Sequence, residues 1–143
     1  TPRMFGFQAA GAAPLVLGHD VENPETVATA IRIGKPASGS KALAARDDSN
    51  GLISSVTDEQ ILDAQAFLAA KEGIFVEPAS AAGVAGLLAL KQSGDLPAGQ
   101  RIVITVTGNG LKDIDTALSR TELSTEAVEP STDRVAALLG LHR

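Results

Sequence analysis

The sequence predicts an α/β fold in which a mostly parallel β-sheet lies between helices, in three αβα layers. Ile102–Val106 is a β-branched, nearly continuous apolar run, which is typical of a strand covered on both faces. Strand and helix patterns alternate from Leu52 to this run, which indicates parallel neighbours joined by right-handed crossovers. Hydrophobic residues make up 44% of the chain, with four Phe and no Trp or Tyr. Such a core of small aliphatic side chains suits helices packed closely on a sheet.

Composition excludes several classes of function. The chain has 143 residues, a length that fits one domain or a large piece of a bigger one, and a net charge of −5. Its Lys and Arg residues are scattered, which argues against a nucleic-acid surface. No apolar run has transmembrane length, so we expect a cytoplasmic protein without a membrane partner. Without cysteine, and with only the distant His19 and His142, the sequence predicts neither a disulfide nor a metal site.

The first forty residues predict a strand, two short helices and a loop. Residues 1–8 read as a strand that leads into a small, closely packed helix ending near Gly18. The abrupt, apolar start is expected of a chain cut inside a domain. Asn23-Pro24-Glu25 supplies helix-start signals, so a helix is predicted from Pro24 to Ile31. Residues 32–40 alternate Gly, Pro and Ser with two cations and predict a loop, which could be a solvated connector or part of a site.

The middle of the chain has a regular rhythm. A helix over Lys41–Arg46 and a turn at residues 47–51 precede a predicted strand at Leu52–Val56. Thr57-Asp-Glu-Gln60 is a capping box that opens a helix ended by Gly73. A short strand, Ile74–Val76, comes next.

The remaining elements complete the predicted layer. Ala81–Leu90 is apolar all round and rich in small residues, which indicates a buried helix, stopped by Gly94 before the strand at Ile102. Residues 121–130 read as a linker, and a terminal helix is predicted over Asp133–Leu139 with Ser131 or Thr132 as its cap. We therefore expect two parts, an α/β part over residues 1–120 and a linker with a helix over residues 121–143.

Two polar side chains follow predicted strands and are candidates for a binding site. Thr107 ends the Ile102 strand and precedes the open turn Gly108-Asn109-Gly110. Glu77 follows the strand Ile74–Val76. Because ligands of open α/β sheets bind at the carboxyl ends of parallel strands, both could face one ligand. The residues alone leave open a plain turn after a core strand, and a Glu77 that only complements a helix dipole.

Four motifs taken together resemble one family of enzymes. They are Pro2-Arg-Met, Ala30-Ile-Arg-Ile-Gly34-x-Pro36-Ala-Ser38, Glu77-Pro-Ala-Ser-Ala81 and Thr107-Gly-Asn-Gly-Leu-Lys-Asp113. Their order and sequence resemble the carboxyl-terminal portion of bacterial threonine synthases, over essentially the whole chain. Those enzymes have the fold type II of pyridoxal-phosphate enzymes, like tryptophan synthase β. They are lyases of threonine biosynthesis that act on a phosphate ester, converting O-phospho-L-homoserine and water to L-threonine and phosphate.

The resemblance implies cofactor-binding roles for residues of this chain. Thr107 corresponds to the Ser or Thr whose hydroxyl hydrogen-bonds the pyridine nitrogen of pyridoxal 5'-phosphate. Glu77 would lie beside the ring edge, and Ile33 and Gly34 would line the ring face. Asn109 is a weaker candidate. Thr105, on the same strand face as Thr107 but a step deeper, is weaker as well.

The resemblance also implies what the chain lacks. The Schiff-base lysine and the phosphate-binding loop of such enzymes belong to an amino-terminal half, so we assign no catalytic residue here. The five lysines of this chain lie in loops or on polar helix faces, where a solvated ammonium is expected. We therefore expect an incomplete domain that is inactive by itself and associates as a homodimer or with the missing half.

Two other readings remain open. The first is another fold type II enzyme, such as a threonine dehydratase or a cysteate synthase, although the continuation Gly108–Asp113 favours threonine synthase. The second is a non-catalytic α/β binding module.

Overall fold

The computed structural model describes residues 2–120 and 127–141. Among these residues, each of the two strands is followed by a series of helical segments. In chain order the elements are β1 (Phe5–Ala9), the 3-10 helix η1 (Ala10–Ala12), α1 (Pro14–Leu17), the 3-10 helix η2 (Thr29–Ile31), α2 (Gly39–Asp48), β2 (Leu52–Val56), α3 (Asp58–Phe67), the π-helical turn η3 (Leu68–Glu72), α4 (Pro78–Ser93), the 3-10 helix η4 (Gly110–Asp113), α5 (Ile114–Leu118) and α6 (Thr132–Leu138).

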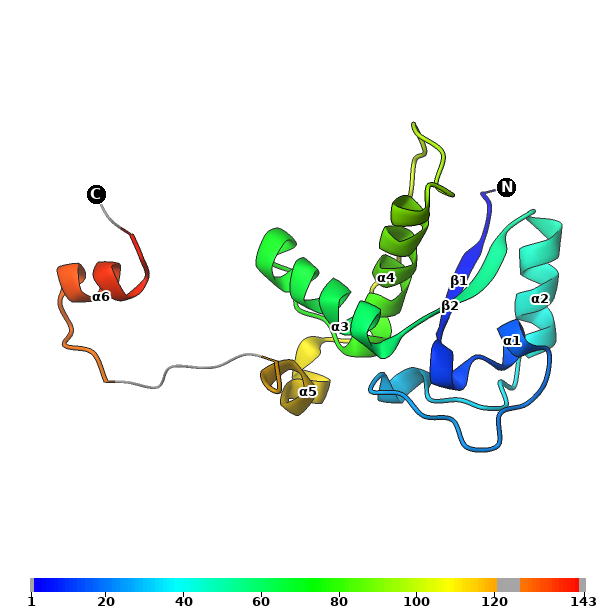
Figure 1. Ribbon diagram of the computed structural model, residues 1–143, viewed down its shortest axis with the longest axis horizontal. Coiled ribbons are helices and arrows are strands. Elements are labelled where there is room, and N and C mark those ends of the chain that lie inside the picture. Colours follow the sequence, from blue (N-terminus) through cyan, green and yellow to red (C-terminus); the bar gives the residue numbers. More distant parts are fainter. Residues whose placement is uncertain (1, 121–126, 142–143) are drawn as a thin grey trace.

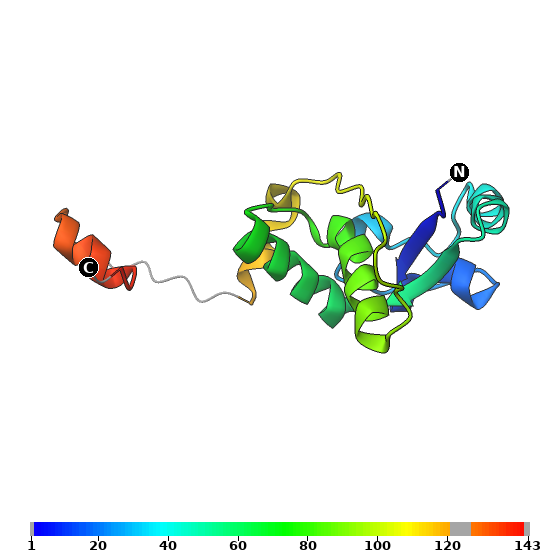
Figure 2. The ribbon, with the colours of Figure 1, turned by 90° about the horizontal axis from the view of Figure 1, so that it is seen from above.

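The strands β1 and β2 form a parallel pair between helices. Phe5 pairs with Leu52 at one end of the ladder, and Ala9 pairs with Val56 at the other. Figures 1 and 2 show α4 on one side of this pair and α1 and α2 on the other. The predicted α/β fold with parallel strands between helical layers is therefore confirmed, and β2 has its predicted bounds.

The core is built from small aliphatic side chains. Short side chains let α4 approach both α3 and the strands closely, as the composition predicted. The buried core residues are Ala9, Ala28, Val56, Ile61, Ala64, Leu68, Val76, Ala81, Ala82, Val84 and Ala85.

The contact between α4 and β1 depends on a glycine. A Cβ atom at Gly86 would overlap the ring of Phe7. Phe7 is partly buried and packs against the core cluster. The absence of a side chain at Gly86 therefore sets how closely α4 lies on the sheet.

Local helix signals are confirmed. The Thr57 hydroxyl accepts the Gln60 N–H at 3.2 Å, and the Gln60 side chain accepts the Thr57 N–H at 2.9 Å, which completes the predicted capping box of α3. Gly18, Gly73 and Gly94 have positive φ and cap the helical segments before them, as predicted. The helix predicted over residues 41–46 is longer and forms α2.

The predicted helix from Pro24 to Ile31 is wrong, since only the single turn η2 forms there. The backbone donors of this stretch bind groups outside it. Glu25 N–H donates to the Gly11 carbonyl at 3.0 Å, and Val27 N–H donates to the Asp58 carboxylate at 2.9 Å. These long-range partners replace the i to i−4 bonds of a helix.

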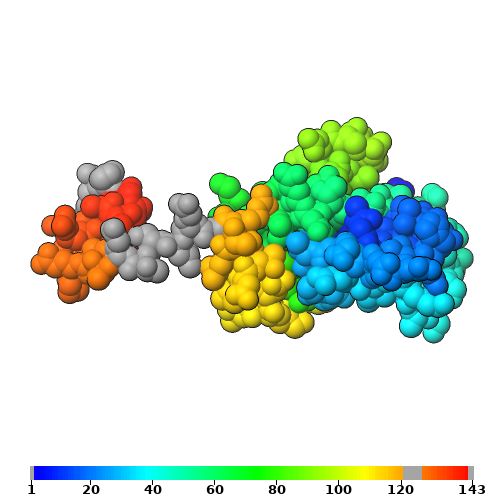
Figure 3. Space-filling model, turned by 60° about the horizontal axis from the view of Figure 1, so that its bottom comes forward, coloured from blue at the N-terminus to red at the C-terminus, as the bar shows by residue number. Residues whose placement is uncertain are grey.

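The predicted strand Ile102–Val106 and its parallel pairing with residues 74–76 are also wrong. Val76 instead makes an isolated antiparallel bridge with Asn109. A strand requires a neighbour along its length, and within residues 2–120 and 127–141 only β1 and β2 pair in that way. Val103 is 90% exposed, which a strand covered on both faces would not allow. In Figure 3 the yellow part of the chain forms part of the molecular surface.

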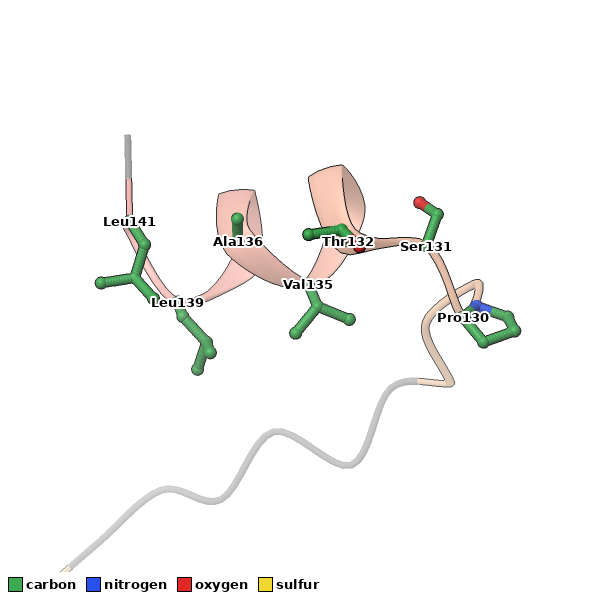
Figure 4. Close-up of a pocket in the computed structure, with 7 residues that line it drawn as sticks. All are labelled: Pro130, Ser131, Thr132, Val135, Ala136, Leu139 and Leu141. Atoms are coloured by element: carbon green, nitrogen blue, oxygen red, sulfur yellow. The ribbon is translucent and has the colours of Figure 1, made fainter. Parts of the chain in front are cut away.

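The carboxyl-terminal helix has its predicted position. α6 begins after Ser131, whose hydroxyl accepts the Arg134 N–H at 3.3 Å. Both ribbon views draw α6 apart from the other elements. Residues 121–126 of the predicted linker lie outside the described residues, so the division at residue 120 stays a prediction. Figure 4 shows Val135 and Leu139 pointing to the same side of α6, over a shallow apolar hollow.

The contact at Gly86 gives a test of the packing. Gly86→Ala should lower the free energy of unfolding by about 1–2 kcal/mol, because overlap with Phe7 costs more than the gain in helix propensity. Urea unfolding followed by circular dichroism measures it. Gly83→Ala is the matched control on α4: its Cβ would lie 3.3 Å from Ile104 Cγ2, a contact that a small shift relieves, so it should cost much less than Gly86→Ala. Equal stability of the two variants would contradict the assigned contact.

Candidate functional site

The turn after Thr107 lies on the amino-terminal end of α4. Gly108 N–H donates to the Ser80 hydroxyl at 2.7 Å, and Thr107 N–H approaches the same oxygen at 3.3 Å. The hydroxyl oxygens of Ser80 and Thr107 are 3.4 Å apart. Ser80 is 6% exposed in the first turn of α4. One buried serine thus holds the backbone and the side chain of the predicted cofactor residue.

Glu77 lies beside the same turn. Its N–H donates to the Gly108 carbonyl at 3.0 Å, and its side chain occupies the space that a Cβ at Gly108 would need. Gly108 is therefore required by a close approach rather than by its backbone angles. The structure therefore places Thr107 and Glu77 at the same turn, and the prediction that both face one ligand stays a prediction.

The charge of Glu77 has a partner on the turn. The Lys112 ammonium lies 3.5 Å from Glu77 Oε1. The Glu77 side chain is 11% exposed, whereas the Lys112 side chain is 64% exposed. The carboxylate is therefore largely removed from water, and its negative charge is offset by a cation that remains hydrated.

The remaining predicted residues have different surroundings. Asn109 caps η4, where its side-chain oxygen accepts the Leu111 N–H at 2.9 Å. Gly34 is buried against Val21, whose N–H donates to the Gly34 carbonyl at 3.0 Å. Ile33 is 48% exposed in the loop after η2, and η2 packs on α4. Within residues 2–120 and 127–141, no hydrogen bond joins Ile33 or Gly34 to Thr107 or Glu77.

The five lysines are all exposed in the described chain. They are Lys35, Lys41, Lys71, Lys91 and Lys112. Lys35 pairs with Asp20 at 2.9 Å, and this hydrogen bond and charge raise the pKa of the Lys35 ammonium. A raised pKa holds an amine in its cationic form, the opposite of what a nucleophilic lysine requires.

Ser80 is the residue that sequence reasoning missed. It belongs to the motif Glu77–Ala81, whose sequence alone assigns it no role. The available signal was a hydroxyl at the start of a buried helix, next to a glycine-rich turn. This signal does not identify the partner of Ser80. Only the fold, which places Gly108 beside the first turn of α4, does so.

Other features of the surface do not point to the site. The described residues contain no cluster of three or more potential metal ligands. One hollow in the surface lies over α6 and another between α3 and α5, and neither is lined by Thr107 or Glu77. Among the described helices, none combines the length and hydropathy needed to cross a membrane.

Comparisons with known proteins identify the family of the chain. Residues 1–108 match the family of pyridoxal-phosphate dependent enzymes. The chain is 53% identical to a threonine synthase of Synechocystis over 97% of its length, and 59% identical to one of Mycobacterium leprae over 82%. It spans only 36% and 32% of those relatives.

Solved structures show the same fold at low identity. O-ureido-L-serine synthase superposes with a TM-score of 0.64 at 20% identity, over 99% of this chain and 39% of that protein. A fungal L-serine ammonia-lyase from Rhizomucor miehei superposes with a TM-score of 0.61 at 23% identity, over 81% of this chain and 40% of that protein. With the family match over residues 1–108, these likenesses show that the chain belongs to the pyridoxal-phosphate dependent enzymes of fold type II.

Proposed function

We propose that this chain is part of a threonine synthase, a lyase that converts O-phospho-L-homoserine and water to L-threonine and phosphate. The observation that supports this most directly is 53% identity to a protein of that name over 140 residues. Identities of 48–59% recur among threonine synthases from several bacteria. We also propose a cytoplasmic location, in keeping with a biosynthetic enzyme of small molecules.

The residues of the site fit pyridoxal phosphate. A neutral hydroxyl at Thr107 suits a pyridine nitrogen, which accepts one hydrogen bond in its unprotonated form. The cofactor supplies an electron sink for chemistry at the carbon atoms of an amino acid. Glu77 beside the turn and the exposed apolar side chain of Ile33 can border a flat ring. Gly34 would hold the Ile33 loop through its bond with Val21.

Thr107 would tune the cofactor rather than protonate it. A hydroxyl is far too weak an acid to transfer its proton to pyridine, whereas a carboxylate at this position would stabilise pyridinium. The ring nitrogen is then held neutral, and its pull on electrons is moderate. We assign Thr107 to this contact and Glu77 to the ring edge.

The reaction can be tested directly. The complete gene product that contains this chain, supplied with pyridoxal phosphate, should release phosphate and L-threonine in equal amounts from O-phospho-L-homoserine. Chromatography of amino acids and a phosphate assay measure both products. The chain of 143 residues alone should give neither.

The control for that assay is the dehydratase reaction, which other enzymes of this fold catalyse. L-threonine offered as substrate should yield no 2-oxo acid, which a dehydratase would produce. Formation of the 2-oxo acid without any threonine synthesis would overturn the proposal.

Removing the Thr107 hydroxyl should weaken the enzyme. Thr107→Val keeps the shape but leaves the ring nitrogen without its donor, a loss of about 1–3 kcal/mol. In the complete enzyme, turnover should fall by roughly one to two decades and cofactor affinity should weaken. Thr105→Val is the control and should be much milder. Full activity of Thr107→Val with loss in Thr105→Val would assign the contact to the other hydroxyl.

The exposed apolar residues predict association. Ile102 is 45% exposed and Val103 is 90% exposed, and Ile74 and Phe75 are further exposed apolar side chains. Because large apolar patches favour association, we expect the chain to self-associate or to bind a partner, and the complete enzyme to form a homodimer. Sedimentation velocity over a hundredfold range of concentration measures this. A stable monomer throughout would contradict it.

A further inference from the structure

The hydroxyl of Ser80 has its acceptor capacity filled. A hydroxyl offers two lone pairs and one proton. The backbone N–H groups of Gly108 and Thr107 both point at Ser80 Oγ, at 2.7 and 3.3 Å. A backbone N–H can only donate, so both lone pairs of the Ser80 oxygen are taken. The acceptor of the Ser80 proton then remains to be identified.

Thr107 is the acceptor within reach of that proton. Across the described residues, the remaining hydrogen bond of the Ser80 hydroxyl is the one to Thr107 Oγ1, at 3.4 Å. The distance between the two oxygens does not show which hydroxyl donates. The two backbone N–H groups decide it, because they occupy both lone pairs of the Ser80 oxygen. Ser80 must donate and Thr107 must accept.

The direction of this bond fixes the behaviour of Thr107. With a lone pair of its oxygen occupied by Ser80, the Thr107 proton points away from Ser80. Thr107 lies on the exposed side of the turn, whereas Ser80 is buried beneath it. The Thr107 proton is therefore not used by Ser80 and is available for donation to a ligand above the turn.

We propose that Ser80 is a positioning residue that makes Thr107 a hydrogen-bond donor to the pyridine nitrogen of the cofactor. This inference rests on the proposed assignment of Thr107 to that nitrogen. Ser80 itself touches neither cofactor nor substrate. It acts through the polarity of a chain of three groups: backbone N–H, Ser80 hydroxyl and Thr107 hydroxyl. Such chains strengthen each bond through mutual polarisation.

The experiment uses the complete enzyme loaded with pyridoxal phosphate labelled with ¹⁵N in the ring. In Ser80→Ala the ring-nitrogen resonance should move toward that of a pyridine without a hydrogen bond, and cofactor affinity should fall about three- to tenfold. Ser93→Ala is the matched control, because Ser93 is an exposed serine at the far end of α4 that bonds Leu90 and Asp95. It should change neither reading.

A double variant separates positioning from a merely structural role. Ser80→Ala also removes the acceptor of the Gly108 N–H, so it will lower stability in any background. If Ser80 acts through Thr107, its effect on the resonance and on cofactor affinity should vanish in a Thr107→Val background, while its effect on stability persists. Ser80→Thr, which keeps the hydroxyl, should restore the resonance. An unchanged resonance in Ser80→Ala, or an equal affinity loss in both backgrounds, overturns the proposal.

The two proposals fail in different ways. A complete enzyme that makes threonine, with a resonance insensitive to Ser80, loses the positioning role and keeps the function. A complete enzyme that makes another product, with a resonance that responds as described, keeps the positioning role and loses the function. Failure of the complete enzyme to bind pyridoxal phosphate overturns both.

Discussion

The clamp at Gly108 is the constraint on which the site depends. Its N–H reaches the Ser80 hydroxyl, its carbonyl accepts the Glu77 N–H, and the space for a side chain is filled by the Glu77 carboxylate. Both polar groups of one residue are therefore used to fasten the end of an extended segment to the start of a helix. A larger residue would separate the two elements, and Thr107 would lose its position.

The position of α4 in turn depends on small residues. Its amino-terminal end meets the turn through Ser80, while its middle rests on β1 through Gly86 and the ring of Phe7. Ala81 and Ala85 are buried in the common core. These contacts leave little room for adjustment. A shift of α4 on the sheet would therefore also move the residues of the site. Close packing of small residues, rather than large aromatic side chains, therefore holds the Thr107 hydroxyl in place.

The sequence predicts features that depend on neighbouring residues, but it does not predict hydrogen bonds between residues far apart in the chain. The capping box at Thr57 and the strand Leu52–Val56 depend on neighbouring residues and were predicted. Residues 24–31 carry helix-start signals, but they form no long helix because the Gly11 carbonyl and the distant Asp58 carboxylate take two of their backbone donors. Thr107 and Glu77 do lie together, although the pairing there is an antiparallel bridge instead of two parallel strand ends. Ser80 was missed because only the fold reveals what its oxygen accepts.

The ion pair between Glu77 and Lys112 affects what the Thr107 hydroxyl can bind. A carboxylate is a stronger acceptor than a pyridine nitrogen, and this one lies against Gly108, next to Thr107 in the chain. If its negative charge were unbalanced, it would compete for the Thr107 proton and draw the hydroxyl away from a ligand. The Lys112 ammonium at 3.5 Å engages that charge, and in our proposal the bond from Ser80 directs the Thr107 hydroxyl independently. On this proposal, the Thr107 hydroxyl can donate to a ligand although a buried carboxylate lies nearby, because Lys112 balances the charge of Glu77 and Ser80 orients the hydroxyl.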